Sequence, residues 1–339
     1  MSFNTDKLVA GSEYDYVTRT SLNQGILRTT GFVNTENINS AGTWSLGLLQ
    51  MDFFYRRKPW YAGQFVRKIT PKIKIESSAI LFFTTLLNRQ KSKLLSVLVR
   101  DVDKVFRSIK IQLPFKDGKI DFDFIESFVA ELEAERVAEL SAYLTVSGFD
   151  NYELSEEELN ALQKYPTINW KTFNLEKLFG KSTRGKRLKS ADRIVGDLPF
   201  VTAGEASEGI SAYIGNDVEV FYENTTTIDM FGSAKYRNYK YGADDHIAVV
   251  HTEKLPMKAS IFVTSAIHKA SHTGKFDYGH NFYAKDADAL DIMLPEKDGK
   301  PDYSYMETLI SAVQKLVIKD VVKYSDDKIN ATKKIVQSH

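Results

Sequence analysis

The sequence predicts an α+β fold of two tandem, mostly-β domains, each followed by a long helix, with the two helices pairing antiparallel in a pseudo-two-fold arrangement. Three observations predict it: an internal duplication, strand-like runs ahead of one amphipathic segment in each copy, and opposite charge on the two amphipathic segments. The expected domains are 1–115 (first globular domain), 116–169 (first helix and linker), 170–296 (second globular domain) and 297–339 (second helix).

The duplication is clearest at a turn that precedes each amphipathic segment, because several of its residues recur 181 positions later. The matched pairs are Leu113-Pro114 with Leu294-Pro295, Lys116–Lys119 with Lys297–Lys300, Val17-Thr18 with Val201-Thr202 (offset 184) and Phe3-Asn4 with Phe173-Asn174 (offset 170). A self-match over most of the chain, in only two copies, indicates a duplicated domain rather than a solenoid. The first copy lacks about 14 residues that the second carries between Lys181 and Ile194.

The globular part of each copy alternates short apolar runs with Gly, Asn and Pro. The strand-like runs are Val17, Trp44–Leu49, Met51–Tyr55, Gln64–Ile69 and Ile80–Leu87 in the first copy, and Val218–Tyr222 and Ile247–Val250 in the second. Their β-branched and aromatic content favours strands over helices. We therefore expect mostly-β regions with a few short helices.

The segments after the two turns have a helical period. Apolar residues recur there at three- and four-residue spacing, namely Ile125, Phe128, Val129, Leu132, Val137, Leu140 and Leu144 in the first copy. About 24 residues make a rod of roughly 36 Å. Residues 121–144 hold seven carboxylates and one arginine, whereas 303–334 hold six lysines and four acids. Complementary charge suggests that the helices pack on each other; the alternative is that each packs only on its own domain.

The linker between the copies contains a short helix. Ser155 followed by Glu158 is a capping box, which opens a helix, and Tyr165-Pro166 ends it.

Composition limits the possible functions. A chain of 339 residues fits two domains, and no run of 18 apolar residues could cross a membrane. The absence of cysteine excludes disulfides, thiol catalysis and cysteine-bound metal, and with no visible secretion signal it fits the cytoplasm. A net charge of +1 means that any nucleic-acid binding must depend on local charge.

A basic loop in the second copy is one candidate contact with a phosphodiester backbone. Its candidate residues are Arg184, Lys186, Arg187 and Lys189. The loop fits the first seven positions of a phosphate-binding P-loop from Gly180, but the eighth is Arg187 rather than Ser or Thr. The alternative is a solvated loop without a partner.

Interleaved cations and aromatic residues at corresponding places of the copies are the second candidate, since Arg and Asn read bases while Lys and Tyr contact phosphates. The residues are Lys235, Tyr236, Arg237 and Tyr239 in the second copy, and Arg56, Arg57 and Lys58 in the first, where the prediction also includes Arg19 and Asn23. The alternative is that the tyrosines belong to the core and the cations surround them.

Other chemistry has weaker support. His268 and His272 could face one way on a helix, but all six histidines lie in the second copy, which argues against an architectural metal. Asp244-Asp245-His246 corresponds to Gly63-Gln64-Phe65, so these carboxylates do not belong to the shared fold, and Asp229 alone forms no catalytic pair. We predict neither a catalytic residue nor a metal ligand in this chain.

The second copy resembles the target recognition domains of restriction-modification specificity (S) subunits. The resemblance is carried by Trp170-Lys171, Phe173, Leu175, Leu178-Phe179, Gly185–Arg187, Pro199–Thr202, Gly209-Ile210, Ile228–Gly232 and Asp244-Asp245. Two such domains span the chain, which looks like a specificity subunit of a type I-like system and most like those of BcgI-like type IIB systems. The first copy keeps Val17-Thr18 and Gly25-Ile26 but lacks the Gly-Lys-Arg loop.

The resemblance implies a non-catalytic reader of a two-part site on double-stranded DNA, with the helices as a spacer. It also implies methyltransferase or methyltransferase-endonuclease partner subunits, which would supply S-adenosylmethionine and magnesium chemistry, while this chain would bind no cofactor. A rod of roughly 36 Å is close to one turn of B-DNA. The alternatives are a nuclease with a diverged site and a scaffold that binds carbohydrate or protein.

Overall fold

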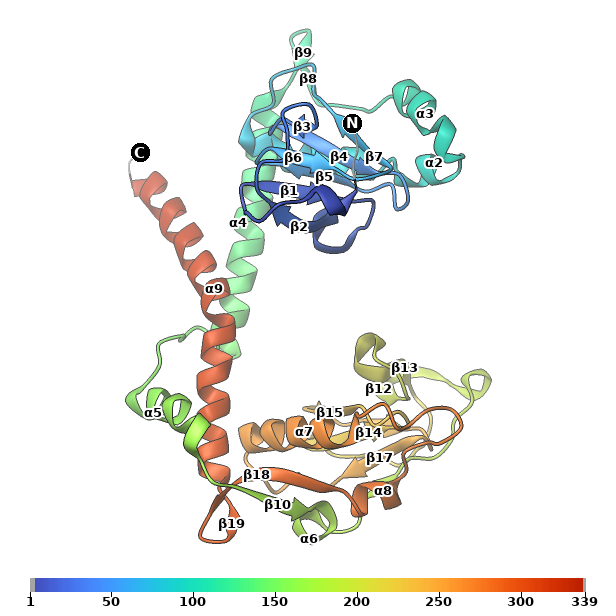
Figure 1. Cartoon of the computed structure of the whole chain (residues 1–339), viewed down its shortest axis with the longest axis vertical. Coiled ribbons are helices and arrows are strands. Elements are labelled where there is room, and N and C mark those ends of the chain that lie inside the picture. Colours follow the sequence, from blue (N-terminus) through green and yellow to red (C-terminus); the bar gives the residue numbers. More distant parts are fainter. Residues whose placement is uncertain (1–3, 338–339) are drawn as a thin grey trace. The chain divides into compact units, whose positions relative to one another are not determined.

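The computed structural model describes residues 4–337, with side chains to residue 333, and divides into two compact units (Figure 1). Unit 1 is Met1–Leu140 with Lys328–His339, and unit 2 is Ser141–Asp327. The expected domain ends at 1–3 and 338–339 lie outside the described residues.

Unit 1 is built on two small sheets and a hairpin, with strand orders β2-β1-β6-β3, β5-β4-β7 and β8-β9. The strands are β1 (Tyr14–Val17), β2 (Ile26–Thr30), β3 (Ile38–Asn39), β4 (Thr43–Gly47), β5 (Phe53–Arg56), β6 (Trp60–Ala62), β7 (Val66–Ile69), β8 (Phe115–Lys116) and β9 (Lys119–Ile120). The main core forms where β4 and β5 bury Trp44, Leu46 and Phe53.

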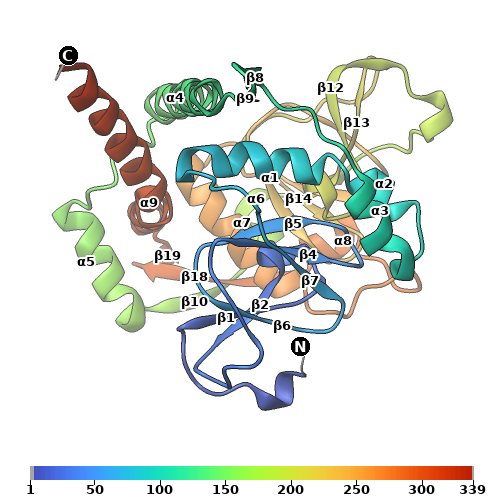
Figure 2. The ribbon, with the colours of Figure 1, turned by 90° about the horizontal axis from the view of Figure 1, so that it is seen from above.

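Helices cover the β5-β4-β7 sheet of unit 1. They are α1 (Ile80–Asn88), α2 (Lys91–Leu95), α3 (Val102–Ser108) and α4 (Phe122–Val146). Helix α1 runs along one side of this sheet (Figure 2) and contacts β5. The start of α4 belongs to the same core, because Ile125 is fully buried in it.

Unit 2 has three sheets, with strand orders β10-β18-β19, β11-β17-β14-β15 and β13-β12-β16. Their strands are β10 (Trp170–Asn174), β11 (Thr183–Arg184), β12 (Val195–Val201), β13 (Ile210–Ile214), β14 (Thr225–Asp229), β15 (Ala234–Arg237), β16 (Gly242–Ala243), β17 (Ile247–Val250), β18 (Asp291–Lys297) and β19 (Lys300–Pro301). Strand β14 is central and buried at every position.

The helices of unit 2 are α5 (Glu156–Lys164), α6 (Leu175–Phe179), α7 (Met257–Ser271), α8 (Ala284–Asp288) and the first part of α9 (Tyr303–Gln337). Helix α7 packs on β14, β15 and β18 and buries Val263 and Ile267 in the core that β17 and β18 share (Figure 1). Met306 of α9 joins this core, so the long helix begins as part of its own domain.

The strand register confirms the duplication. In unit 1 the parallel pair β1–β6 aligns Val17 with Ala62, and in unit 2 the parallel pair β12–β16 aligns Val201 with Ala243. The antiparallel partner also recurs, because Val17 faces Ile26 and Val201 faces Ile210, each next to a register shift. The two units therefore contain the same strand arrangement despite low sequence similarity.

Two predicted strands are wrong. Ile80–Leu87 forms helix α1, where Phe83 is buried and the Asn88 side chain bonds the backbone N–H and carbonyl of Phe53. A short apolar run fits a buried helix as well as a strand, and tertiary packing decides. Val218–Tyr222 forms no strand: it contributes one isolated bridge, Phe221 with Tyr241.

The predicted long helices are present. Helix α4 has 25 residues and α9 has 35. Within unit 1 the Lys328 ammonium of α9 lies 2.8 Å from the Glu133 carboxylate of α4, so the oppositely charged helices make contact there. The predicted fold class is confirmed. Across residues 4–337, no helix combines the length and apolar character that crossing a bilayer requires.

Candidate nucleic-acid interface

Two arginines predicted to contact DNA, Arg56 and Arg237, are buried instead, at 2% and 1% exposure. The Arg237 guanidinium donates from Nε to Thr227 Oγ1 and from Nη1 to the Glu208 carbonyl, both at 2.9 Å. Arg56 repeats this pattern, with Nε donating to Ser45 Oγ at 2.9 Å and Nη2 to the Gln24 carbonyl at 2.5 Å. Both guanidinium groups are bonded within the fold in this structure, which indicates a structural role for each arginine.

The loops that these arginines hold have unusual backbone angles. Asn23 and Gln24 have φ of 46° and 52°, and Ser207 and Glu208 have φ of 49° and 55°. Left-handed backbone costs ordinary residues about 1–2 kcal/mol each. The arginine at the base of each loop offsets this cost by donating a hydrogen bond to a carbonyl of the loop. Burial lowers the pKa of Arg56 to about 10, which still leaves it charged at neutral pH.

The neighbours of Arg237 are also mostly engaged within the fold. The Lys235 ammonium bonds Ser233 Oγ at 2.9 Å and Glu205 Oε1 at 3.2 Å. The Tyr236 hydroxyl donates to Asn224 Oδ1, and that of Tyr239 accepts from Arg237. For this stretch, the structure matches the alternative in which the tyrosines join the core and the cations pair around them.

The remaining candidates of unit 1 differ in availability. The Lys58 ammonium pairs with Asp15 Oδ1 at 2.8 Å and bonds the Ser12 carbonyl at 3.1 Å. Arg57 is exposed in the turn between β5 and β6. Asn23 is exposed on the loop that Arg56 holds, and its amide bonds the Ile26 carbonyl at 3.2 Å. Arg57 and Asn23 thus remain accessible, whereas Lys58 is partly neutralised.

The basic loop of unit 2 is exposed and charged. Arg184, Lys186, Arg187 and Lys189 are all exposed, and none has a side-chain hydrogen bond or ion pair with any residue of 4–337. Strand β11 holds the loop, because it pairs Arg184 with Ala248 of β17. The Lys186 N–H donates to the Ala243 carbonyl at 3.0 Å. Unpaired cations on an anchored backbone can contact an anion at little ordering cost.

Gly185 explains how closely this loop approaches the sheet. A Cβ placed on Gly185 would lie 1.9 Å from the Ala243 carbonyl oxygen, so only glycine fits. The segment from Gly180 to Arg187 is not a P-loop, since it follows the short helix α6 rather than a strand and itself contains strand β11.

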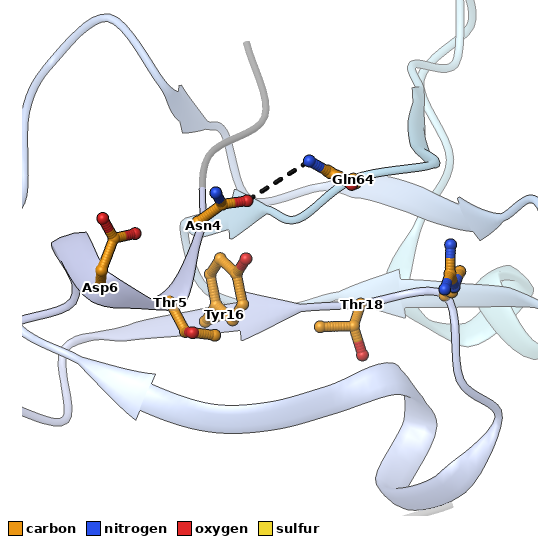
Figure 3. A pocket seen from close by; sticks show the side chains of 7 residues that line it. Asn4, Thr5, Asp6, Tyr16, Thr18 and Gln64 are labelled. Atoms are coloured by element: carbon orange, nitrogen blue, oxygen red, sulfur yellow. Dashed lines mark hydrogen bonds between the residues drawn. The ribbon is translucent and has the colours of Figure 1, made fainter.

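An open pocket of about 500 Å³ lies in unit 1 at the corresponding place (Figure 3). Six of its lining residues are Asn4, Thr5, Asp6, Tyr16, Thr18 and Gln64. Arg19, a predicted contact residue, also lines it. Burial, opposed by nearby Arg28, raises the pKa of Tyr16, so its hydroxyl stays neutral. The sequence prediction missed Gln64, whose only signal is its place in the turn that matches Asp244-Asp245-His246.

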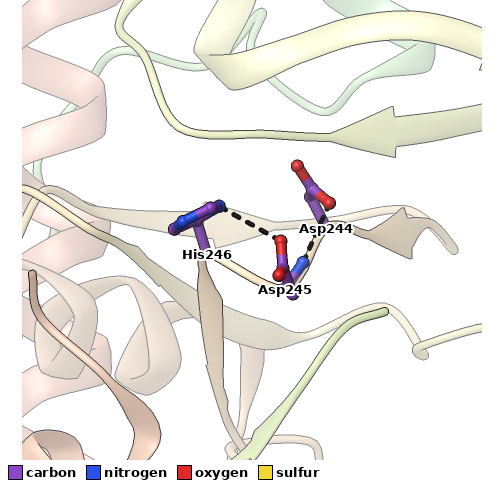
Figure 4. A group of neighbouring side chains, drawn as sticks. All are labelled: Asp244, Asp245 and His246. Carbon is purple, nitrogen blue, oxygen red and sulfur yellow. Dashed lines mark hydrogen bonds and ion pairs between the residues drawn. The ribbon is translucent and has the colours of Figure 1, made fainter. Parts of the chain in front are cut away.

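The matching turn of unit 2 carries Asp244, Asp245 and His246 (Figure 4). His246 Nδ1 lies 3.1 Å from Asp245 Oδ1, and the Asp245 N–H donates to Asp244 Oδ1 at 3.0 Å. Burial raises the pKa of Asp244, and the carboxylate of Asp245 adds to this effect. Three adjacent, partly exposed groups do not define a metal site by themselves.

Two other residues considered for chemistry have structural contacts. His268 Nδ1 accepts the Ala234 N–H at 3.1 Å, and its ring stacks on that of His272. Asp229 is buried, and its Oδ1 accepts the N–H groups of Phe231 and Ser233, each at 3.0 Å. Both side chains accept hydrogen bonds from the backbone where β14 leads into β15.

Comparison with known proteins fits this architecture. Residues 2–142 and 167–324 match the family described as type I restriction modification DNA specificity domain. The chain is 22% identical over 270 residues to S.BcgI, the specificity subunit of a type II restriction enzyme of Heyndrickxia coagulans, covering 78% of this chain and 75% of that protein. A type I S subunit of M. genitalium has a similar fold, with a TM-score of 0.56, 13% identity, and coverage of 99% of this chain and 90% of that one.

Two matches to one family model, spanning most of the sequence, show that the chain belongs to the type I restriction modification DNA specificity domain family. Members of this family are the non-catalytic, DNA-recognising components of restriction-modification systems, which assemble with other subunits. The chain is accordingly a DNA specificity subunit, and its similarity to S.BcgI agrees with the BcgI-like type predicted from its motifs.

Proposed function

We propose that this subunit reads a two-part target on double-stranded DNA, one half with each unit. The proposal rests on a contrast between the two units: they share one strand arrangement, but the groups exposed on it differ. The units share strand register and a buried arginine, yet equivalent positions expose an amide-lined pocket in unit 1 and a basic loop beside carboxylates in unit 2. Different exposed groups on one frame fit two different half-sites.

Within this proposal, Arg184, Lys186, Arg187 and Lys189 contact phosphates, with Arg19, Asn23 and Arg57 available in unit 1. The four cations of the basic loop are exposed and make no side-chain hydrogen bond or ion pair within residues 4–337, which supports their assignment. Phosphate contacts supply affinity and orientation rather than base preference.

The proposal extends to the assembly. The partners would be methyltransferase or methyltransferase-endonuclease subunits, which would bind S-adenosylmethionine and magnesium, in the cytoplasm. The expected domains at 1–115 and 170–296 would be the two readers, and 116–169 and 297–339 would supply the helical spacer.

The first test removes charge from the basic loop. The double variant Arg184→Ala, Arg187→Ala should bind DNA more weakly, and the slope of log affinity against log salt should become shallower by about 2, since each lost phosphate contact removes about 0.9. The matched control is Lys254→Ala with Lys269→Ala, two exposed lysines of unit 2 outside the loop. An unchanged slope in the loop variant would contradict its assignment.

The second test is protection of DNA from cleavage by the chain together with its partner subunits. Two protected segments separated by an unprotected gap are expected. A single continuous footprint, or protection without sequence preference, would contradict the two-part target.

A further inference from the structure

We propose that Arg19 and Gln64, at the rim of the unit 1 pocket, read base edges in the major groove of the first half-site: Arg19 a guanine and Gln64 an adenine. The inference depends on the proposed function and adds to it the residues that determine base preference in unit 1. Arginine pairs with guanine O6 and N7, and glutamine with adenine N6 and N7, each through two hydrogen bonds.

Arg19 has the properties of a side chain held ready for an external acceptor. It is exposed, and no residue of 4–337 accepts a hydrogen bond from it. Its guanidinium lies over the Phe65 ring, 5.4 Å from the centroid. A cation–π contact of this kind restrains the guanidinium, while its N–H groups remain available to an external acceptor. Phe65 is itself 48% exposed, so the pair lies at the surface.

Gln64 lies next to Phe65 in the β6–β7 turn and is also exposed. Its Nε2 donates to Asn4 Oδ1 at 3.4 Å, a long contact that leaves its carbonyl oxygen and its second N–H available (Figure 3). The single long hydrogen bond orients the amide and leaves its other donor and acceptor positions unused. This is the state that a two-bond contact with adenine requires.

The opposite rim of the pocket is anchored. Arg28 Nη2 donates to the Thr5 carbonyl at 2.9 Å, which holds the 3₁₀ helix Thr5–Lys7. The next residues are tied to β2, because the Val9 N–H donates to Thr30 Oγ1 at 3.1 Å and the Gly31 N–H to the Val9 carbonyl at 3.2 Å. Asn4 is therefore supported from a fixed segment, and the pocket is organised before DNA arrives.

The location follows from the duplication. The β6–β7 turn that carries Gln64 matches the β16–β17 turn, where Lys186 of the basic loop bonds the Ala243 carbonyl. The first copy lacks the loop residues, and the pocket opens beside its version of the turn. Unit 1 thus presents hydrogen-bonding side chains beside a turn that unit 2 flanks with a phosphate-contacting loop.

The test uses the full chain with its partner subunits and a random duplex library, from which the wild-type complex first selects its target. Arg19→Ala and Gln64→Ala should each reduce preference at one base pair by about tenfold to a hundredfold, in the same half-site only. Arg19→Lys should keep affinity and only part of the guanine preference, because an ammonium can reach guanine O6 and N7 but lacks the planar fork of the guanidinium. Lys68→Ala, which removes an exposed cation on β7, is the control and should leave all base preferences unchanged.

Uniform loss of affinity in Arg19→Ala, with no change of preference at any base pair, would reassign Arg19 to a phosphate and overturn the inference. Unchanged preferences in Gln64→Ala would overturn its part. If the wild-type complex selects no sequence at all, the proposed function fails instead. Both side chains are exposed, so the variants should fold like wild type, which thermal unfolding checks.

Discussion

The basic and aromatic residues of this chain divide into those that build the frame and those that face outward. Arg237 and Arg56 are of a residue type that often contacts DNA, but both are buried like core residues. Each satisfies a carbonyl of a left-handed loop and a hydroxyl of the neighbouring strand. A buried, hydrogen-bonded cation of this kind is costly to alter, because its removal leaves several polar groups with fewer hydrogen bonds.

Arg237→Lys should therefore act on stability. Lysine keeps the charge but cannot donate to Thr227 and to the Glu208 carbonyl in the fixed geometry of a guanidinium. We expect the free energy of unfolding to fall by about 1–3 kcal/mol, as measured by urea denaturation of the full chain.

Arg56→Lys should give a similar loss, since its contacts repeat those of Arg237. Arg57→Lys, at an exposed position next to Arg56, is the matched control and should change little. Normal stability of Arg237→Lys together with altered base preference would show that the residue reads DNA after all.

The sequence alone does not show which of these cations are buried and which are exposed. The alternation of cations with tyrosines is the same whether the stretch faces solvent or the core, so Arg237 and Arg187 look alike in one dimension. The exposure of the basic loop was predictable because its cations are dense and Leu188 is the one large apolar residue among them. Gln64 was not, because a single amide carries no periodic or charge signal.

At the scale of elements, the linker helix α5 shows how a local motif becomes tertiary structure. Ser155 and Glu158 form the predicted capping box, and Glu158 also bonds Lys315 of α9 at 2.9 Å. The Tyr305 hydroxyl donates to the Ala161 carbonyl at 2.8 Å, a second tie between α5 and α9. Burial alone would raise the pKa of Glu158, but the Ser155 N–H and the Lys315 ammonium together lower it.

The attachment of α5 should consequently depend on pH. A carboxyl whose pKa is lowered by folding stabilises above its ordinary value of 4.5, and this contribution is lost as pH falls through the lower, folded value. Glu158→Gln, which keeps the capping box, should speed hydrogen exchange of the α5 amides by about fivefold at pH 7 through a loss of about 1 kcal/mol.

Below the folded pKa, wild type and Glu158→Gln should exchange at similar rates once the intrinsic pH dependence is removed. Glu156→Gln, a charge removal at an exposed position of the same helix, is the control. An equal effect of both variants at pH 7 would show that the pair with Lys315 does not hold α5.

Elements with a distinct local signal were predictable, whereas short apolar runs were predicted with mixed success: four of them form strands β4, β5, β7 and β17. The heptad-like stripe ahead of Leu144 and the capping box at Ser155 depend on local spacing, and α4 and α5 follow them. Ile80–Leu87 lacks a period long enough to separate helix from strand, and its packing on β5 makes it helical. Val218–Tyr222 has strand-like residues but only one bridging partner.

For the whole molecule, the duplication was visible in sequence offsets and is confirmed by matching strand registers. It separates the proposed contacts into two units, so substitutions in different units should act independently. Gln64→Ala and Arg187→Ala should change the free energy of DNA binding additively, within about 0.5 kcal/mol.

The measurement is a double-variant cycle on the selected DNA at one salt concentration. As a comparison inside one unit, Arg19→Ala combined with Gln64→Ala should deviate from additivity, because both side chains flank Phe65. Strong coupling between Gln64 and Arg187 would show that the halves of the target are not read separately.

The left-handed loops held by buried arginines have a consequence for how such proteins diversify. Each guanidinium donates a hydrogen bond to a main-chain carbonyl, a group that every amino acid possesses. The side chains of the loop residues Asn23, Gln24, Ser207 and Glu208 remain exposed. Mutation can replace those side chains without removing the hydrogen bond between the arginine and the loop backbone. New base preferences can therefore evolve on an unchanged loop backbone, as long as the two buried arginines are retained.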